Sequence, residues 1–116
     1  MQKLVSVIIP FYNSSLTLER SIQSILSQDY TRLEVILIDD CSTDCSTSIA
    51  LKYSSRYRNI KFYQNKTNLG VSCSRNIGAK LSCGELISFL DSDDYYISNS
   101  KISNSVSLIE KYFSVS

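Results

Sequence analysis

Histidine and tryptophan are absent from this 116-residue chain, which has only one proline and three glycines. Without histidine, the chain cannot form a histidine-ligated metal site, use an imidazole general base or build a Ser-His-Asp triad from its own residues. The three glycines form no G-x-G-x-x-G string, so a dinucleotide-binding Rossmann motif is excluded. Any chemistry must therefore depend on other side chains.

An excess of charge and a long apolar run are missing as well. Twelve basic and eleven acidic residues leave a net charge of +1, without the basic surplus of a nucleic-acid-binding surface. No apolar run approaches the roughly 20 residues of a membrane helix, and Met1-Gln2-Lys3 leads into a short strand-like run rather than a signal peptide. We expect no nucleic-acid partner, no membrane span and a cytoplasmic location, with peripheral contact at the inner face of the cell membrane left open.

The four cysteines lack the spacing of a metal site. Cys41, Cys45, Cys73 and Cys83 form no C-x-x-C pair, and no histidine is present to complete a zinc ligand set. A disulfide framework is little better supported in a chain without a secretory signal. We expect reduced thiols that are mostly buried and behave as small hydrophobic side chains.

Four apolar segments rich in β-branched residues punctuate the sequence. Three of them (VSVII, LEVILI and ELISFL) are nearly continuous in apolar character, which is typical of strands covered on both faces. Segments with a helical period lie between them, and this alternation predicts an α/β fold with a mainly parallel sheet and flanking helices. The predicted strands are Leu4–Ile9, Leu33–Ile38, Ile60–Tyr63 and Glu85–Leu90.

Each predicted helix carries an apolar stripe, and Asp44 and Asn68/Gly70 are candidates for helix entry. The length allows one domain. We assign residues 1–97 to one α/β unit and residues 98–116 to a serine-rich, weakly specified helix, whose end at Ser116 predicts a boundary imposed on a longer protein. The stripes are Leu18, Ile22, Ile25 and Leu26; Ile49, Tyr53 and Tyr57; Val71, Ile77 and Leu81; and Ile102, Val106, Ile109 and Phe113.

Acidic residues cluster directly after two of the predicted strands, at the sheet edge where parallel folds bind ligands. Carboxylates about 4 Å apart repel by roughly 4 kcal/mol at an effective dielectric constant near 20, so such a cluster favours a bound cation. The alternative is that each aspartate caps the following helix. The two windows hold six of the eleven acidic residues: Asp39, Asp40 and Asp44, then Asp91, Asp93 and Asp94.

The second window has the form of a metal-diphosphate site. Oxygen ligands select a hard cation, Mg²⁺ or Mn²⁺, which completes its shell with water and phosphate oxygens. Asp91-Ser92-Asp93 supplies such ligands. D-x-D is a weak motif by itself, and its position directly after an apolar strand strengthens it.

Four strings of the sequence, taken in order, resemble the family-2 glycosyltransferases, which adopt the GT-A fold and use nucleotide-diphosphate sugars. The resemblance runs from Val5 to Asp94 with the expected intervals, and four agreeing motifs are far more specific than D-x-D. The strings are VSVIIPFYN (Val5–Asn13), SIQSILSQDY (Ser21–Tyr30), EVILIDDCSTDCS (Glu34–Ser46) and NLGVSCSRNIGAKLSCGELISFLDSDD (Asn68–Asp94).

The resemblance implies roles for residues on the nucleotide side of the site. Pro10 and Tyr12, with Asn13 in the same turn, would form a wall against the base, on which Tyr12 can stack. Asp40, and with it Asp39, would accept a hydrogen bond from the base or ribose. A carboxylate accepts and does not donate, which favours a base that presents an N–H group.

The resemblance also implies roles on the diphosphate side. Arg75 and Asn76 would lie near the diphosphate or the acidic cluster, where the arginine fork suits phosphate oxygens. Asp93 would ligate the metal ion. Asp91 would join it as a ligand or hold sugar or ribose hydroxyls or a metal-bound water, with Ser92 between the two in the nucleotide-sugar site.

The implied reaction is an inverting transfer of a sugar from a nucleotide-diphosphate sugar, with UDP-sugar favoured, to a glycan or lipid-linked acceptor in cell-envelope polysaccharide synthesis. Two departures stand out. Cys41 occupies a position where the family usually has glycine, which predicts an altered turn. No counterpart of the acceptor-binding half and its general base is found, so we expect this chain alone to transfer no sugar. Two alternatives stay open: a module that binds nucleotide and metal without transfer and, less favoured, a receiver-like signalling domain.

Overall fold

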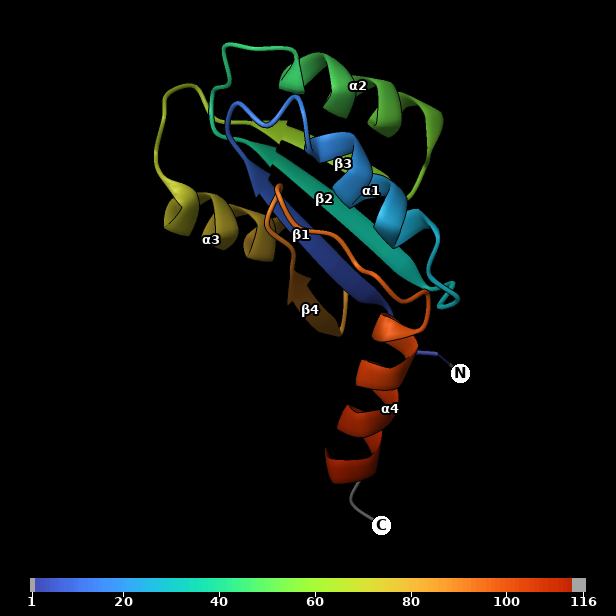
Figure 1. Cartoon of the computed structure of the whole chain (residues 1–116). Coiled ribbons are helices and arrows are strands. Elements are labelled where there is room, and N and C mark those ends of the chain that lie inside the picture. Colours follow the sequence, from blue (N-terminus) through green and yellow to red (C-terminus); the bar gives the residue numbers. More distant parts are fainter. Residues whose placement is uncertain (1, 114–116) are drawn as a thin grey trace.

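The computed structural model describes residues 2–113 and contains one four-stranded sheet in which every pairing is parallel. The order across the sheet is β3-β2-β1-β4, so β1 and β2 lie in the middle (Figure 1). This confirms the predicted α/β class and all four predicted strands, with shifts of one or two residues at their ends. The strands are β1 (Val5–Phe11), β2 (Leu33–Asp39), β3 (Ile60–Gln64) and β4 (Leu86–Phe89).

The register brings the ends of three strands together. β1 and β2 end level, because Phe11 pairs with Asp39. β4 pairs with the other side of β1 and ends at Phe89, opposite Ile8. The segments that follow β1, β2 and β4 therefore leave the sheet at the same edge, as expected for the carboxyl ends of parallel strands.

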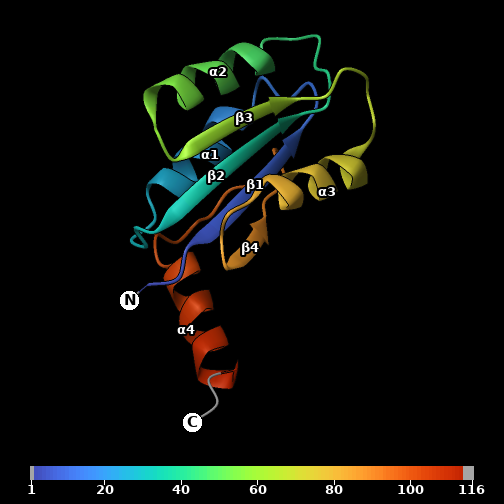
Figure 2. The same ribbon diagram turned by 180° about the vertical axis from the view of Figure 1, so that it is seen from behind.

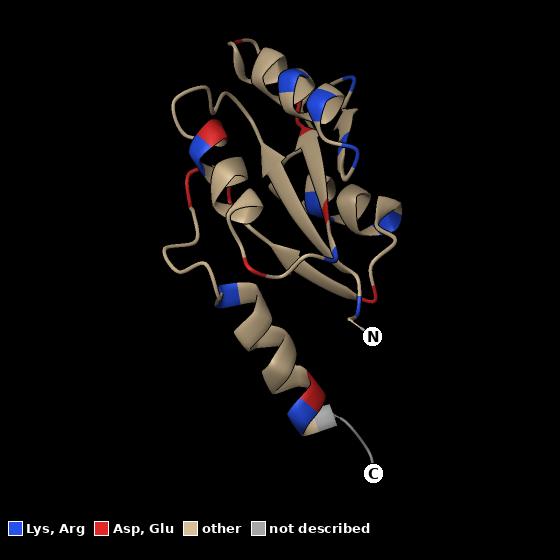
Figure 3. Cartoon of the chain, turned by 90° about the vertical axis from the view of Figure 1, so that its right-hand side faces the viewer, with Lys and Arg blue, Asp and Glu red and all other residues tan. Residues whose placement is uncertain are grey.

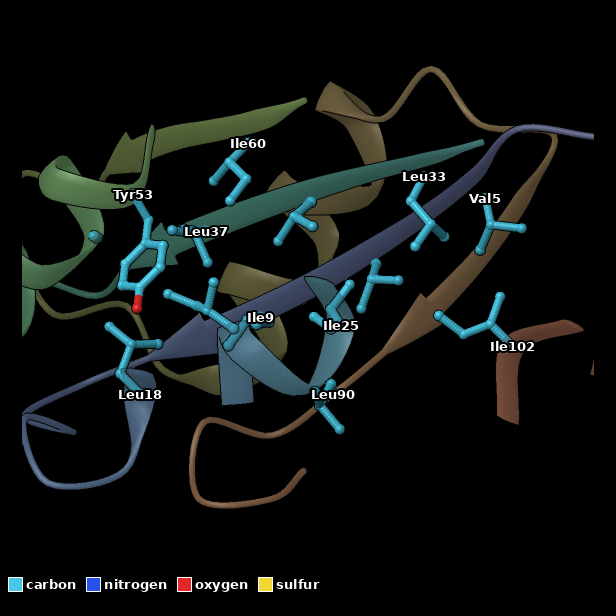
Figure 4. Close-up of a cluster of buried hydrophobic side chains, with 14 of the residues drawn as sticks. Val5, Ile9, Leu18, Ile25, Leu33, Leu37, Tyr53, Ile60, Leu90 and Ile102 are labelled. Atoms are coloured by element: carbon cyan, nitrogen blue, oxygen red, sulfur yellow. The ribbon is translucent and has the colours of Figure 1, made fainter. Parts of the chain in front are cut away.

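Helices cover both faces of the sheet. α1 (Leu18–Leu26) and α2 (Ser46–Arg56) lie on one face, and α3 (Val71–Leu81) lies on the other (Figures 1 and 2). The larger core fills the space between the sheet and the α1 side (Figure 4). The two central strands of the sheet, β1 and β2, are buried along their whole length, which explains their nearly continuous apolar sequence.

The apolar stripe predicted for α3 was wrong at two of its three positions, whereas Ile77 is partly buried and packs against the buried cluster of Ile8, Ile36 and Ile38 as predicted. Val71 and Leu81 are about half exposed, whereas Ser74 and Gly78 are buried against the sheet. A Cβ atom on Gly78 would lie 2.4 Å from Cγ2 of Ile8. The helix packs so closely on β1 that its most buried positions hold small residues.

The last helix, α4 (Lys101–Phe113), projects from the body of the molecule (Figure 1). Ile102 and Val106 are buried as predicted, whereas Ile109 is 36% exposed, and the side chain of Phe113 lies outside the described residues. Within residues 2–113, each helix is too short or too polar to cross a bilayer.

The expectation of mostly buried thiols was also wrong. All four cysteines are free, but Cys45, Cys73 and Cys83 are exposed and Cys41 is partly buried. The reason is positional: these residues lie in loops and on the outer side of α3 rather than in a strand.

Candidate functional site

A cleft of about 460 Å³ opens at the carboxyl edge of the sheet. Both acidic windows contribute to it, as the parallel topology predicts. The segments after β1 and β4 and the first turns of α3 supply the rest of the wall. The lining residues are Pro10, Phe11, Tyr12, Ser14, Asp40, Val71, Ser74, Arg75, Asp91, Ser92 and Asp93.

Asp40 is held almost completely by its own chain. Asp40 lines the cleft although it is only 5% exposed. Its Oδ1 accepts hydrogen bonds from Leu69 N–H (2.7 Å) and Asn65 Nδ2 (3.0 Å). Oδ2 accepts from Gly70 N–H at 2.9 Å. Burial alone raises the pKa of Asp40, but these hydrogen bonds outweigh it and hold the pKa below its usual value.

Asp39, the residue before it, is not among the residues that line the cleft. Its carboxylate is fully buried and accepts hydrogen bonds from Ser42 N–H (2.8 Å), Gln64 Nε2 (3.1 Å) and the Thr47 hydroxyl. These donors come from the loop after β2, from β3 and from α2. Asp39 therefore joins three elements behind the cleft wall.

The turns after β1 and β2 are tied to each other. Asn13 adopts a φ of 49°, and its Oδ1 accepts hydrogen bonds from Thr43 N–H (2.8 Å) and Asp44 N–H (3.3 Å). Asn13 thus supports the cleft wall from outside the lining. Cys41 has a φ of 69°. The turn keeps a left-handed residue at this position, with cysteine in a conformation that glycine adopts more easily.

Arg75 on α3 and the two aspartates of the loop after β4 differ in how many of their polar groups have partners. Arg75 Nη2 lies 2.9 Å from Asp91 Oδ1 in a partly exposed ion pair. Arg75 Nε is buried and has no hydrogen-bond partner within residues 2–113. Asp93 is exposed, and its carboxylate accepts no hydrogen bond and joins no ion pair in that same range. Arg75 and Asp93 therefore border the same cleft, the one with an N–H and the other with a carboxylate that no group within residues 2–113 engages.

An apolar wall faces these charges. Pro10 and Phe11 belong to β1 and are buried, whereas the Tyr12 side chain is 47% exposed where it borders the cleft. A half-exposed phenol ring offers a flat surface on which a planar ligand can stack.

Several lining residues were missed by sequence reasoning, and three predicted residues, Asn13, Asp39 and Asn76, are not among those that line the cleft. Ser14 and Ser74 line the cleft, and Ser14 Oγ lies 2.7 Å from Ser92 Oγ. Short hydroxyl residues are abundant in this chain and carry no spacing signal that would single these out. Asn76 is exposed on α3 and does not border the cleft.

The donor set fits a hard cation that takes part of its shell from a ligand. Asp91 and Asp93 supply only oxygen, as Mg²⁺ and Mn²⁺ prefer. Within the described part of the chain no group of three or more metal-ligating side chains gathers. Phosphate oxygens and water would therefore have to complete the shell.

Comparisons with known proteins agree with this geometry. The family profile described as Glycosyl transferase family 2 matches residues 6–115. An uncharacterized glycosyltransferase of Haemophilus influenzae is 42% identical over 99 residues, which cover 85% of this chain and 39% of the relative. The Escherichia coli UDP-Glc:alpha-D-GlcNAc-diphosphoundecaprenol beta-1,3-glucosyltransferase WfaP is 41% identical over 109 residues, which cover 93% of this chain and 42% of the relative.

Solved structures confirm the predicted GT-A fold. The structure of Staphylococcus aureus TarS 1-349 in complex with UDP-GlcNAc superposes with a TM-score of 0.86 and 35% sequence identity, covering 95% of this chain and 32% of that one. The chain thus spans about two fifths of the H. influenzae and E. coli relatives and about a third of the TarS structure.

Proposed function

Because the chain belongs to glycosyl transferase family 2, we propose that its cleft binds a nucleotide-diphosphate sugar, with UDP-sugar favoured, as the donor for glycosyl transfer. One observation carries the proposal. A half-exposed tyrosine ring, a guanidinium with a buried unpartnered N–H and two exposed carboxylates line the same cleft. These are the groups that a base, a diphosphate and its metal ion require.

The nucleotide end rests on Tyr12 and Asp40. Tyr12 stacks on the base against Pro10. Asp40 stays ionised at neutral pH because its pKa is lowered, and three of its roughly four acceptor positions are already used. The remaining one accepts from a base N–H, as uracil provides. UDP-Glc in the name of WfaP and UDP-GlcNAc in the TarS complex support a uridine donor.

The diphosphate end rests on Arg75, Asp91 and Asp93. Arg75 donates its free Nε–H to a phosphate oxygen while its Nη2 stays on Asp91. Asp93, with Asp91, holds Mg²⁺ or Mn²⁺. When bound, the ion stabilises the charge that develops on the departing diphosphate. The acceptor is a glycan or a lipid-linked sugar, as the diphosphoundecaprenol in the name of WfaP supports, and the transfer is inverting.

Calorimetry with UDP tests the donor site. We expect Mn²⁺ or Mg²⁺ to raise the affinity of the chain for UDP at least tenfold over a metal-free sample. Tyr12→Ala should weaken UDP binding about tenfold with and without metal, because base stacking contributes roughly 1–3 kcal/mol and does not involve the ion. Tyr63→Ala, which removes a similarly exposed ring on β3, is the control. Equal UDP affinity with and without metal would contradict the metal site.

A second function, binding of nucleotide and metal without transfer, is favoured by one observation. The cleft carboxylates are Asp40, Asp91 and Asp93, and each has a role in the donor site, so none is left as a general base for the acceptor hydroxyl. We therefore expect no glycosyl transfer by this chain alone. Steady transfer to an added acceptor, lost in Asp93→Asn, would show that the chain is a complete enzyme.

A further inference from the structure

Building on the proposed function, we infer that one polar face of α1 positions the loop that carries Asp91 and Asp93, with Arg20 and Ser21 as its positioning residues. Neither Arg20 nor Ser21 borders the cleft. Both contact the main chain of the loop rather than its carboxylates. Their effect on a bound metal ion is therefore indirect.

Ser21 holds the loop on both sides of Asp93. The side chain of Ser21 is fully buried. Its Oγ lies 3.0 Å from the carbonyl oxygen of Ser92 and also contacts the carbonyl oxygen of Asp94. The hydroxyl has one proton to donate and a further acceptor within α1, the Thr17 carbonyl oxygen at 3.4 Å. Because the carbonyls on both sides of Asp93 lie against this one buried oxygen, the backbone at Asp93 cannot turn without losing one of these contacts.

Arg20 holds the same loop from the solvent side. Its Nη2 donates a hydrogen bond of 3.2 Å to the carbonyl oxygen of Asp93. The guanidinium also lies over the ring of Tyr95, 4.2 Å from the ring centroid, in a cation–π contact. Figure 3 shows α1, with its adjacent acidic and basic positions, beside the acidic loop that follows β4. Because Arg20 is exposed, its loss should leave the core intact.

The same face of α1 continues to hold the chain beyond the loop. Ser24 Oγ accepts a hydrogen bond of 3.1 Å from Tyr96 N–H, and Gln28 Nε2 donates one of 2.7 Å to the Ser98 carbonyl oxygen. Gln28 Oε1 accepts another, of 3.0 Å, from Ile102 N–H. Ser21 and Ser24 lie three residues apart and share one face of α1, and Gln28 follows two residues after the end of that helix.

The neighbouring face of α1 is apolar and fixed to the sheet. Leu18, Ile22 and Ile25 are fully buried in the main core. Packing of these residues in the same core as β1 and β2 fixes α1 relative to the sheet. Hydrogen bonds from α1 and from Gln28 after it then fix residues 92–102 relative to α1. A metal site needs its ligands held in place before the ion arrives. The other side-chain contacts of this loop, between Ser92 and Ser14 and between Asp91 and Arg75, do not reach Asp93.

The inference is tested by the factor by which Mn²⁺ raises UDP affinity, measured by calorimetry. Arg20→Ala and Ser21→Ala should each reduce this factor about three- to tenfold, the range expected for one or two hydrogen bonds. UDP affinity without metal should stay within about twofold of the wild-type value, because Tyr12 and Asp40 lie on other loops. A purely structural defect would lower both affinities together.

Two controls and a rescue variant match these changes. Arg58→Ala removes the same charge from an exposed turn. Ser27→Ala removes the hydroxyl of the residue that caps the C-terminus of α1, which donates its hydrogen bond back to the Gln23 carbonyl oxygen rather than to the loop after β4. Both should keep the full metal response. Arg20→Lys retains a cation near the Tyr95 ring and an N–H donor. It should recover at least half of the loss that Arg20→Ala causes in the logarithm of the factor by which Mn²⁺ raises UDP affinity.

The outcomes separate this inference from the proposed function. A wild-type chain whose UDP affinity does not respond to Mn²⁺ overturns both. A wild-type response that persists unchanged in Arg20→Ala, with Ser21→Ala either unchanged or unfolded, overturns the positioning role alone. Loss of the response in Arg20→Ala without rescue by Arg20→Lys also counts against it.

Discussion

The two acidic windows of this chain have similar sequences and opposite surroundings. After β2, Asp39 and Asp40 are buried, and every oxygen of their carboxylates accepts a hydrogen bond from the chain itself. After β4, Asp91 and Asp93 are exposed; Asp91 meets one arginine, and Asp93 is unengaged within the described residues. Aspartate thus stabilises the fold through hydrogen bonds in the first loop, whereas in the second loop its carboxylate is exposed to solvent and available to a ligand.

The difference follows from which neighbours each loop has. The loop after β2 lies between β1 and β3 and beneath residues 65–70, so main-chain N–H groups converge on it from several sides. The loop after β4 follows an edge strand of the described sheet. α1, Ser14 and Arg75 contact it, but within residues 2–113 no main-chain N–H donates to the carboxylate of Asp91 or Asp93. A satisfied carboxylate contributes to folding, whereas a solvated one remains available to a cation.

The largest expected difference between the windows is in stability. Asp39→Ala should lower the free energy of unfolding by about 3 kcal/mol, because it removes a fully buried carboxylate that accepts three hydrogen bonds, from Ser42 N–H and from the side chains of Gln64 and Thr47. Asp93→Ala should change it by no more than about 0.5 kcal/mol, as for an exposed position. Urea unfolding of both variants measures this. Similar losses in the two variants would show that the windows do not differ as described.

The next effect is on metal-dependent UDP binding, where we expect the second window to matter more than the first. Asp93→Asn should lower the affinity for UDP in the presence of Mn²⁺ about tenfold, or 1.4 kcal/mol, because a direct ligand is lost. Asp29→Asn, the same change at an exposed position outside both windows, should have no effect on calorimetric titrations. A full metal response in Asp93→Asn would assign the ion to other residues.

A smaller effect should appear in the pH dependence of stability. The pKa of Asp40 is lowered in the folded chain, so its contribution to stability is complete above the unfolded pKa, about 3.9, and is lost as the pH falls through the folded value. In Asp40→Asn, the free energy of unfolding should therefore fall less steeply below pH 4 than in the wild type. Urea unfolding between pH 2.5 and 6 provides the comparison, and parallel curves would count against the hydrogen-bonded carboxylate.

The smallest effect concerns the strained turn of the first window. Cys41→Gly should raise the free energy of unfolding by about 0.5–1 kcal/mol, since it relieves a left-handed conformation at φ 69° that costs an L-residue roughly 1–2 kcal/mol, offset by the greater freedom of unfolded glycine. Cys45→Gly, a few residues on at a negative φ, should not stabilise the chain. Thermal unfolding of the two variants is the measurement.

By itself, the sequence determined the order of strands and helices and the edge on which the aspartates gather. Runs such as VSVII and LEVILI are apolar at all positions but one, so they have to be covered on both faces, and helices between parallel strands provide that cover. Aspartates that directly follow such runs must then meet at one edge. Pro10, Tyr12, Arg75 and the D-x-D residues could be chosen for the cleft on this basis and on the family resemblance.

Only the tertiary structure decided which side chains inside these elements are buried and which donors reach each carboxylate. The close approach of α3 to β1 places Ser74 and Gly78 inside and the larger Val71 and Leu81 outside, against the rule that large apolar residues mark the inner face. The burial of Asp39 and Asp40, the exposure of Asp93 and the contacts of Arg20 and Ser21 with the loop after β4 depend on residues 25 to 73 positions apart in the chain. Local sequence patterns extend over a few residues, whereas hydrogen bonds are satisfied by whatever the fold brings within about 3 Å.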